Sequence, residues 1–431
     1  MLDIRFIRDN IDLIRDNLKR RRDDKKLKEF DNLLRLDEKV RELKREIQDL
    51  RTQRNRLSRE IGELKKSGKD DSKLVKKVSA VNKQISKVEA ETDKTEIKLR
   101  QIQMSIPNLL HESVPYGKDE EDNEVVKEWG GRPEFEFEYQ SHVDLLDSLD
   151  IGDIPRAARL AGSRFYYLKN ELVLLDIAMQ QMALEMLIKL GYSPIYPPFM
   201  MRREPYEGVT DLADFENVMY KIEGEDLYLI ATSEHPMAGM YMGEIFEPTD
   251  LPLKLAGVSA CFRKEAGSHG KDTKGIFRVH QFNKVEQFVF SLPEESWAIH
   301  EELIKNEEDF IQALKLPYRV VNVCTGDIGI VAAKKYDLEF WFPGQQMYRE
   351  GGSCSNCTAY QATRLNIKYR LKKGGTEKAY LHTLNSTMMA NPRTMVAIIE
   401  NYQKEDGSVE IPKALQKYLP SGLKEIVPQK K

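Results

Sequence analysis

The stretch from Cys261 to Glu286 holds the densest group of residues that could do chemistry. Its two ends alternate apolar and charged residues and flank a loop rich in glycine and lysine, which predicts a hairpin. Arg263 and Glu265 would share a face of the first strand, because side chains two apart point the same way. Arg278 would lie on the returning strand. Two guanidiniums and two carboxylates beside a loop suit a phosphate-containing substrate, although a surface hairpin with ordinary salt bridges is the alternative.

The elements that must position this hairpin follow residue 141, where helical segments alternate with pairs of strands. A strongly apolar helix is predicted at 170–190, followed by a strand that ends at Pro198. Two further strands are predicted at 336–342 and 346–353. Frequent hairpins with helices outside them favour an antiparallel α+β sheet over βαβ units. The sequence contains neither GxxxxGK[ST] nor GxGxxG, so neither a P-loop nor a Rossmann site is expected.

The longest periodic feature lies near the N-terminus, and we expect it to form an arm. Apolar residues recur alternately three and four apart in two runs, which is the heptad pattern of a coiled coil. A turn at 67–71 separates the runs, so they should fold back as an antiparallel helical hairpin over about 38–104. At the rise of an α-helix this hairpin would be roughly 40–50 Å long. Residues 1–37 are expected to form one or two short helices at its base.

The predicted arm is basic, although the whole chain is not. Residues 1–110 carry 30 Lys and Arg against 21 Asp and Glu, a net of +9, whereas the whole chain has −3. A segment with this charge could bind a polyanion. The alternative is that its charges simply keep a helical surface solvated. Weighting of the charge toward the tip favours a nucleic-acid backbone. The residues concerned are Arg51, Arg54, Arg56, Arg59, Lys65, Lys66, Lys73, Lys76 and Lys77.

Length and composition set the remaining limits. A chain of 431 residues should hold two or three domains, and we expect a helical domain at 1–110, a linker and first strand at 111–140, and a body at 141–431. No signal-peptide core and no apolar run near ~18 residues is present, so a soluble, cytoplasmic protein without membrane contact is expected. Cys354 and Cys357 have zinc-like spacing, but no second pair completes it, and no structural zinc is expected.

Three segments, taken in order, resemble the class II aminoacyl-tRNA synthetases. The run Phe262-Arg263-Lys264-Glu265 with Phe282 on the return resembles motif 2 of that class. The long helix and the strand ending at Pro198 resemble motif 1, and Arg393 matches the arginine of motif 3. Further stretches at 232–234, 348–356 and 382–387 narrow the resemblance to the seryl-tRNA synthetase family, in its common rather than its methanogenic type. The run Ser233-Glu234-His235-Pro236 indicates an archaeal or eukaryotic-like relative.

The resemblance implies a reaction and an ATP site. A serine carboxylate would attack the α-phosphorus of ATP, and the tRNA 3′-hydroxyl would then take the seryl group. Arg263 would contact the α-phosphate and the serine carboxylate, and Arg278 and Arg393 the β- and γ-phosphates, which makes these three arginines the catalytic residues. Glu265 would read the adenine amino group. The implied ATP site comprises Arg263, Lys264, Glu265, Arg278, Val279, Glu350, Gly351, Gly352, Ser353 and Arg393.

A metal ion and a serine pocket are implied as well. Glu350 and Ser353 would hold Mg²⁺ with the ATP, since oxygen ligands suit that ion. Gly351 and Gly352 stand where bulkier residues are common in the family, which predicts a looser phosphate side. The implied serine site comprises Thr232, Ser233, Glu234, Arg263, Glu286, Asn385 and Thr387. Among these, Glu286 and Thr387 would read the substrate hydroxyl, and Thr232 and Glu234 its amino group.

The implied partners are ATP, L-serine and tRNA(Ser), with tRNA(Sec) where it is present, and a second copy of the chain bound through the motif 1 region. Two other functions compete. A ligase of the same fold that loads a carrier protein would lack the long basic arm. A non-catalytic coiled-coil interaction protein would tolerate loss of the motif arginines, yet Arg263, Arg278 and Arg393 are all present.

Overall fold

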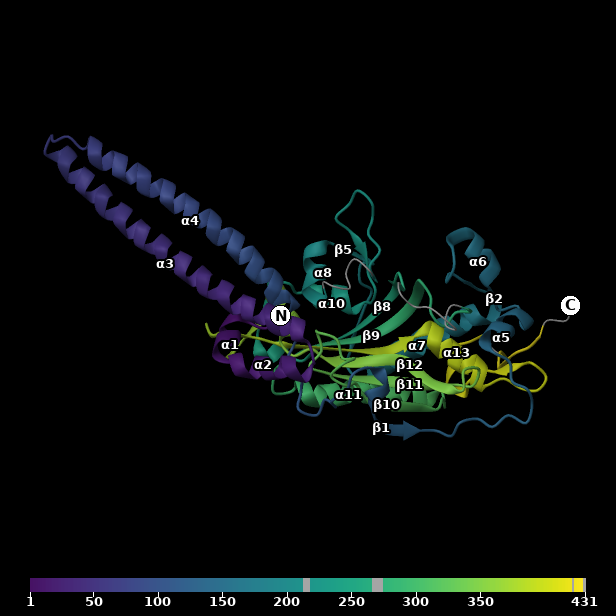
Figure 1. The fold of residues 1–431 in the computed structure, drawn as a ribbon. Coiled ribbons are helices and arrows are strands. Elements are labelled where there is room, and N and C mark those ends of the chain that lie inside the picture. The colour runs from purple at the N-terminus through teal and green to yellow at the C-terminus, as the bar shows by residue number, and fades with distance from the viewer. Residues whose placement is uncertain (212–217, 266–273, 421, 429–431) are drawn as a thin grey trace. The chain divides into compact units, whose positions relative to one another are not determined.

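The computed structural model describes residues 1–211, 218–265, 274–420 and 422–428. It divides into two compact units, which are treated separately below (Figure 1). The arm is Leu2–Pro107, and the body is Asn108–Lys431 together with Met1.

The arm consists of four helices, and the last two are by far the longest. They are α1 (Ile4–Asp9), α2 (Ile11–Arg20), α3 (Asp24–Lys66) and α4 (Ser72–Ser105). Helix α3 begins well before residue 38, because the Asp23 side chain caps it by accepting the Lys26 amide at 2.9 Å. The base of the arm is therefore two short helices plus the first turns of α3, and not short helices alone.

The predicted heptad seam is the buried interface of α3 and α4, which run antiparallel in Figure 1. Leu43 and Ile47 of α3 pack with Val88 of α4, and the seam continues outward in the same way. The two threonines that interrupt it, Thr92 and Thr95, donate their hydroxyls to the carbonyls four residues earlier, at 2.8 and 2.7 Å. Their polar groups are therefore satisfied without leaving the seam, and the predicted coiled-coil arm is confirmed.

The body is built on one sheet of eight strands in the order β1-β10-β11-β12-β15-β9-β8-β4. Every neighbouring pair is antiparallel except β4 with β8. The predicted antiparallel α+β sheet is confirmed. The strands are β1 (Glu124–Trp129), β4 (Ser193–Ile195), β8 (Leu253–Phe262), β9 (Gln281–Ser291), β10 (Tyr318–Asn322), β11 (Lys334–Phe342), β12 (Met347–Asn356) and β15 (His382–Ala390).

The main core lies between this sheet and the helices α7 (Asn170–Lys189), α11 (Ser296–Ala313) and α13 (Asn391–Asn401). Alternation along β15 separates the two sheet faces. The Ser386 hydroxyl donates to Glu307 of α11 at 3.2 Å, so Ser386 faces the helices. Its neighbours on either side therefore face the opposite surface of the sheet.

Smaller elements surround the sheet. The helices are α5 (His142–Ser148), α6 (Ile154–Ala161), α8 (Arg203–Val209), α10 (Glu234–Gly239), α12 (Tyr360–Leu365), α14 (Lys413–Gln416) and the 3₁₀ turns η1 (Glu120–Asp122) and η2 (Pro248–Asp250). The short strands are β2 (Gly152–Asp153), β3 (Tyr167–Leu168), β5 (Met200–Met201), β6 (Tyr228–Leu229), β7 (Ile245–Phe246), β13 (Lys368–Arg370), β14 (Lys378–Tyr380), β16 (Val409–Glu410) and β17 (Glu425–Ile426).

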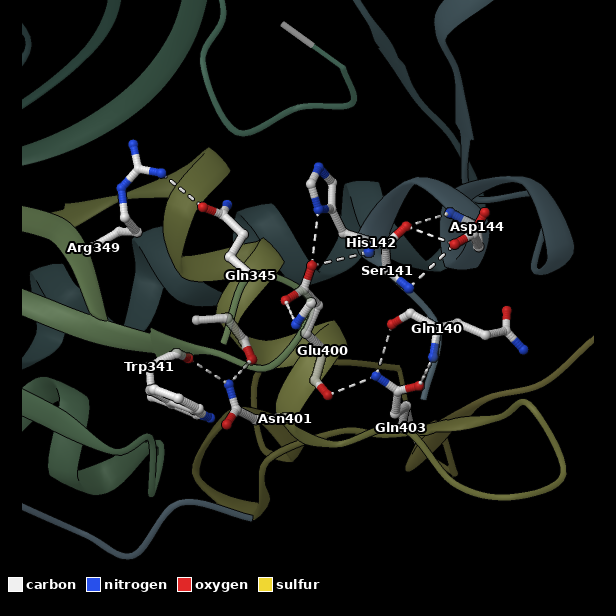
Figure 2. A network of polar contacts seen from close by, with 12 residues as sticks. Gln140, Ser141, His142, Asp144, Trp341, Gln345, Arg349, Glu400, Asn401 and Gln403 are labelled. Carbon is white, nitrogen blue, oxygen red and sulfur yellow. Dashed lines mark hydrogen bonds and ion pairs between the residues drawn. The ribbon is translucent and has the colours of Figure 1, made fainter. Parts of the chain in front are cut away.

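A buried polar network fixes the end of α13 (Figure 2). The Glu400 carboxylate accepts the His142 backbone amide at 3.0 Å and lies 2.9 Å from the His142 Nδ1 atom. Its second oxygen accepts the Gly344 amide at 2.9 Å. These contacts tie the start of α5 and the turn before β12 to α13, the helix that carries Arg393 near its first turn. The network therefore holds the orientation of a predicted site residue from the far end of its helix.

The hairpin from Cys261 to Glu286 differs from the prediction in one respect. Strand β8 ends at Phe262 and β9 begins at Gln281, so Arg263, Glu265 and Arg278 all lie beyond the strands. Glu265 has a φ of +48°, which breaks the extended backbone, and the predicted shared strand face is therefore wrong. The glycine- and lysine-containing loop at 266–273 lies outside the described residues.

Candidate active site

One pocket on the face of the sheet opposite α11 gathers residues from motif 2, motif 3 and the three further predicted stretches, but none from motif 1. Its walls come from β9, β12, β15, the start of α10, both ends of the β8–β9 connection and the first turn of α13. The lining residues are Thr232, Glu234, Arg263, Glu265, Phe277, Arg278, Val279, Phe282, Lys284, Glu286, Glu350, Gly351, Gly352, Ser353, Asn385, Thr387, Ala390, Pro392 and Arg393.

One end of this pocket, which we call the arginine end, is partly open to solvent. The Arg278 guanidinium lies 3.4 Å from the Glu265 carboxylate, and its side chain is 32% exposed. Arg393 lies 3.3 Å from the Glu350 carboxylate and is 21% exposed. Arg263 donates from Nε to the Ala231 carbonyl at 3.3 Å. The three guanidiniums thus converge on one cavity, each held by oxygen atoms.

Aromatic rings support two of these arginines. The Arg263 guanidinium lies 5.3 Å from the centre of the Phe282 ring, and the Arg393 guanidinium lies 5.2 Å from that of Phe277. A ring face attracts a cation and restricts the motion of a long side chain. Phe282 of the resembling motif therefore has a physical role in this pocket.

Glu350 is ionised despite its position on the pocket wall. Desolvation opposes its charge, but Arg393, Lys335 and Arg263 outweigh that effect and lower its pKa to about 2. Ser353 lies on the same strand and lines the same pocket. A charged carboxylate and a hydroxyl give the oxygen ligands that Mg²⁺ prefers.

Other side chains pack closely against the neighbouring glycines, Gly351 and Gly352, so no empty space remains beside them. A Cβ atom on Gly351 would lie 2.1 Å from the Phe340 ring, and one on Gly352 would lie 1.9 Å from the Glu307 carboxyl. The prediction of a looser phosphate side is therefore wrong at these two positions, because Phe340 and Glu307 fill the space that side chains would take.

The other end of the pocket, the carboxylate end, is buried. Glu286 is 1% exposed and forms an ion pair with Lys284, and it also accepts the Asn385 side-chain amide at 3.2 Å. Thr387 pairs directly with Glu286 across β15 and β9, so the two side chains lie on the same sheet face. A small ligand at this end would meet fixed polar groups with little water.

Glu234 completes the carboxylate end from α10. Its carboxylate accepts the Gln361 side-chain amide at 2.9 Å. Burial, with repulsion from Glu286, raises the pKa of Glu234 to about 7, against the opposing effect of Lys284. Thr232 lines the pocket beside it. The protonation state of Glu234 therefore changes near neutral pH, unlike that of Glu350.

Two predicted site residues do not line the pocket. Ser233 is fully buried and its hydroxyl donates to the Gly257 carbonyl at 3.4 Å. Lys264 is positioned through its backbone, whose amide donates to the Val218 carbonyl at 2.9 Å. Both therefore contribute to the shape of the site, while the other predicted ATP-site and serine-site residues border the cavity itself.

Among the site residues that the sequence did not predict, which include Phe277 on the pocket wall, Lys284 and Gln361 support the carboxylate end. Lys284 stands two positions before Glu286 on β9 and pairs with it; strand alternation could have indicated this contact. Gln361 comes from α12 and bridges Glu234 to the Val209 carbonyl, which its amide reaches at 3.1 Å. No local pattern marks Gln361, because Val209 and Glu234 both lie more than a hundred residues before it.

The basic residues predicted for the arm lie along its outer half. Most of their side chains are exposed, with Arg54 partly buried. Arg51 is engaged by Glu89 across the hairpin at 2.8 Å, and similar pairs join Lys39 to Glu91 and Lys44 to Glu96. The lysines near the turn, such as Lys73 and Lys76, thus present charge to solvent at the tip.

The four cysteines all lie in the interior of the body. All four are buried as free thiols, and in the described portion of the chain no cluster of three or more His, Cys, Asp or Glu side chains is arranged around a common point. Burial raises the pKa of both Cys354 and Cys357, which keeps these thiols protonated. In the same described ranges, no helix is both long enough and apolar enough to cross a membrane.

Comparison with known proteins accounts for both units of the chain. The model of the seryl-tRNA synthetase N-terminal domain matches residues 1–110, and that of the tRNA synthetase class II core domain (G, H, P, S and T) matches residues 218–402. A serine–tRNA ligase from Methanoculleus marisnigri is 62% identical over 317 residues, which cover 73% of this chain and 74% of the relative.

Two solved structures extend the similarity to the whole chain. The seryl-tRNA synthetase from Pyrococcus horikoshii, complexed with ATP, is 50% identical with a TM-score of 0.94 and complete coverage of both chains. The cytoplasmic serine–tRNA ligase from Naegleria fowleri, in complex with AMP, is 36% identical with a TM-score of 0.88, covering 100% of this chain and 99% of that one.

The similarity to these relatives includes both the body that holds the pocket and the arm. It favours neither of the two competing functions, a carrier-protein ligase or a non-catalytic coiled-coil protein. The archaeal resemblance is confirmed as well. The chain belongs to the seryl-tRNA synthetase family of class II aminoacyl-tRNA synthetases, ligases that attach serine to tRNA with ATP.

Proposed function

We propose that the arginine end of the pocket binds ATP and that the carboxylate end binds serine. The observation that carries this assignment is the convergence of three arginines and of the buried Glu286 on one cavity. The reaction of the family needs no activated nucleophile, since the serine carboxylate itself attacks phosphorus. Catalysis then depends on positioning and on charge neutralisation, which the chain can supply.

At the arginine end, each cation has a distinct task. Arg263 neutralises the α-phosphate and aligns the serine carboxylate, since it lies where both ends of the pocket meet. Arg278 and Arg393 hold the β- and γ-phosphates, and both lie beside carboxylates that keep them aligned before ATP arrives. Glu265 accepts the adenine amino group, with Val279 against the ring. Fixed guanidiniums stabilise the charge that develops on the α-phosphate more strongly than water would.

Glu350 and Ser353 are the residues that would hold Mg²⁺. When bound, this ion neutralises charge on the phosphate oxygens. The low pKa of Glu350 fits that role, because its carboxylate needs no deprotonation before it binds a cation.

At the carboxylate end, Glu286 and Thr387 read the serine hydroxyl. Lys284 and Asn385 hold the Glu286 carboxylate in place through an ion pair and a hydrogen bond. Thr232 and Glu234 receive the serine amino group. A substrate without the hydroxyl would leave buried polar groups unpaired, which is the strongest form of discrimination that such a pocket has.

The exposed apolar face of α7 supports a homodimer through the motif 1 region. Val173, Leu174, Ile177 and Ile188 are between 36% and 53% exposed on this one helix. A row of large aliphatic side chains on one helix is typical of a protein interface. Sedimentation equilibrium should give twice the chain mass, and Ile177→Glu should shift it to that of a single chain.

The arm supports tRNA binding through its exposed tip cations. Ile47 and Val88 pack together partway along the hairpin, so a short turn joining the helices just beyond them would keep the base of the arm intact. This shortened chain should retain serine-dependent ATP–pyrophosphate exchange while tRNA charging collapses. Loss of exchange in the shortened chain would contradict the division of labour between arm and body.

The pocket assignment is tested by amino-acid-dependent ATP–pyrophosphate exchange with serine, threonine, alanine and glycine. Serine should be the preferred substrate, with alanine and glycine strongly disfavoured. Exchange that depends on another of these amino acids, and not on serine, would overturn the assignment of the carboxylate end.

A further inference from the structure

The backbone at Arg263 departs from the hydrogen-bond pattern of the sheet that it leaves. Strands β8 and β9 pair as far as Phe262 and Gln281, so Arg263 and His280 are the next opposite residues. In an antiparallel hydrogen-bonded pair, two residues exchange both of their N–H···O bonds. Here the Arg263 amide donates to the His280 carbonyl at 3.0 Å, but the His280 amide donates to the Arg164 carbonyl, at 3.1 Å. The Arg263 carbonyl therefore needs a different donor.

The side chain of His280 takes the place of its own amide. Its Nδ1 atom lies 2.8 Å from the Arg263 carbonyl oxygen and 2.9 Å from the Tyr220 hydroxyl. A carbonyl oxygen can only accept, so we assign the proton to Nδ1, which then donates to the Arg263 carbonyl. The imidazole thus completes the strand pairing at the residue where β8 has ended and the active site begins.

Aromatic neighbours hold the plane of this imidazole. The Phe165 ring stacks on it, with ring centres 5.1 Å apart and planes at 27°. The Tyr220 ring meets it edge-on, with ring centres 6.1 Å apart. Aromatic pairs prefer such stacked and edge-to-face arrangements. Contacts within the protein therefore hold the Nδ1 atom of His280 toward the Arg263 carbonyl.

The segment that receives the His280 amide also supports the chain on the other side of Arg263. The Arg164 guanidinium donates to the Glu265 carbonyl at 2.7 Å. Glu265 has a φ of +48°, so the chain turns away from the strand direction there. The carbonyls of Arg263 and Glu265 are thus both held by side chains, and the arginine between the strand and the turn has a fixed backbone.

We propose that His280 is a positioning residue for the reaction of the family. It fixes the backbone of Arg263 and so sets where the guanidinium meets the α-phosphate and the serine carboxylate. The proposal rests on the role proposed above for Arg263. His280 is not among the described residues that line the pocket, so it acts through Arg263. The guanidinium contacts with the Ala231 carbonyl, at 3.3 Å, and with the Phe282 ring, at 5.3 Å, depend on this backbone position.

Asparagine and glutamine at position 280 separate this role from packing. The Asn side-chain nitrogen is as many bonds from Cβ as Nδ1 is, and the Gln nitrogen as many as Nε2. His280→Gln should lower serine-dependent pyrophosphate exchange at saturating ATP and serine about a hundredfold, as for a displaced catalytic group. His280→Asn keeps a donor at the Nδ1 position and loses the ring contacts, so its rate should stay within about tenfold of the parent rate.

The two variants control for each other, because both lose the same imidazole ring. Urea denaturation should give them similar free energies of unfolding, although their exchange rates differ. Equal exchange in the two variants would overturn the proposal, as would parent-like exchange in His280→Gln. A difference in exchange that only follows a difference in unfolding free energy would also overturn it.

A double-mutant cycle tests whether His280 acts through Arg263. If it does, adding His280→Gln to Arg263→Ala should lower exchange by less than about threefold, because the guanidinium that it positions is already gone. A further loss of about a hundredfold would show independent action and would overturn the proposal. A failure of the role proposed for Arg263 would appear instead as near-parent exchange in Arg263→Ala alone, so the two failures are distinguishable.

Discussion

The two ends of the active-site pocket hold their charges in opposite ways. At the arginine end the side chains of Arg278 and Arg393 are 32% and 21% exposed. Each forms an ion pair with a carboxylate of its own, which an incoming phosphate can replace. At the carboxylate end Lys284 and Glu286 are 6% and 1% exposed, and they pair with each other. A charge near water costs little to keep unpaired, whereas a buried one is costly without its partner. The arginine end is therefore suited to attract a polyanion, and the carboxylate end to select a small molecule.

The largest expected effect comes from removing the arginine where the two ends meet. Arg263→Ala should lower serine-dependent pyrophosphate exchange about a thousandfold, because a fixed donor to the charged transition state is lost. Arg263→Lys keeps the charge but not the planar fork, and should lie between the parent and the alanine variant. Steady-state exchange at saturating ATP and serine measures both variants. A loss below tenfold in Arg263→Ala would contradict the assigned role.

Breaking the buried pair should affect folding as well as serine binding. Lys284→Met leaves the buried Glu286 without its ion-pair partner, and should lower the free energy of unfolding by about 3 kcal/mol. The matched change at the arginine end, Arg278→Met, should lower it by less than ~1 kcal/mol, because that pair is partly solvated. Urea denaturation of both variants, with serine and ATP KM values, tests the contrast.

A double variant separates the electrostatic cost from serine recognition. In Lys284→Met/Glu286→Gln no buried charge is left unpaired, so much of the lost stability should return while serine recognition stays impaired. If Lys284→Met and Arg278→Met prove equally stable, the distinction between the two ends is wrong.

The sequence predicted the arginine end more completely than the carboxylate end. The three arginines lie in local motifs, and a motif can be read without knowledge of the fold. Gln361 could not be read in this way, because its roles depend on hydrogen bonds with Val209 and Glu234 from distant segments. The periodicity of apolar residues was enough to predict the sheet and the two paired helices of the arm. It did not predict where α3 begins, because that start depends on one capping hydrogen bond to the Asp23 side chain. The positive φ of Glu265 could not be predicted either, because the alternation of apolar and charged residues continues through this position.

The two ends should also respond differently to pH. The pKa of Glu234 is about 7 and that of Glu350 about 2, so of these two carboxylates Glu234 gains a proton between pH 8 and 6 while Glu350 stays charged. Because the raised pKa means that the carboxylate is charged only above neutral pH, the serine ammonium should lose its partner as the pH falls. The serine KM should therefore rise roughly tenfold per pH unit below 7, while the ATP KM changes much less from this cause. Glu234→Gln should bind serine weakly at every pH and remove this slope.

The smallest expected effect extends the comparison to the arm, whose exposed cations resemble the arginine end more than the carboxylate end. Lys76 and Lys77 are exposed near the tip on α4, and Lys94 and Lys98 are exposed nearer the base of the same helix. Lys76→Ala/Lys77→Ala should weaken tRNA binding and reduce the slope of log affinity against log salt by about one for each phosphate that the arm no longer neutralises. The matched Lys94→Ala/Lys98→Ala variant should leave the slope unchanged, and neither variant should alter the serine KM. Filter binding over a range of salt concentrations measures the slopes, and equal slopes for the two variants would show that affinity does not depend on the tip.

Because exposed charges are screened by salt and buried ones much less, the same salt series should raise the ATP KM more than the serine KM.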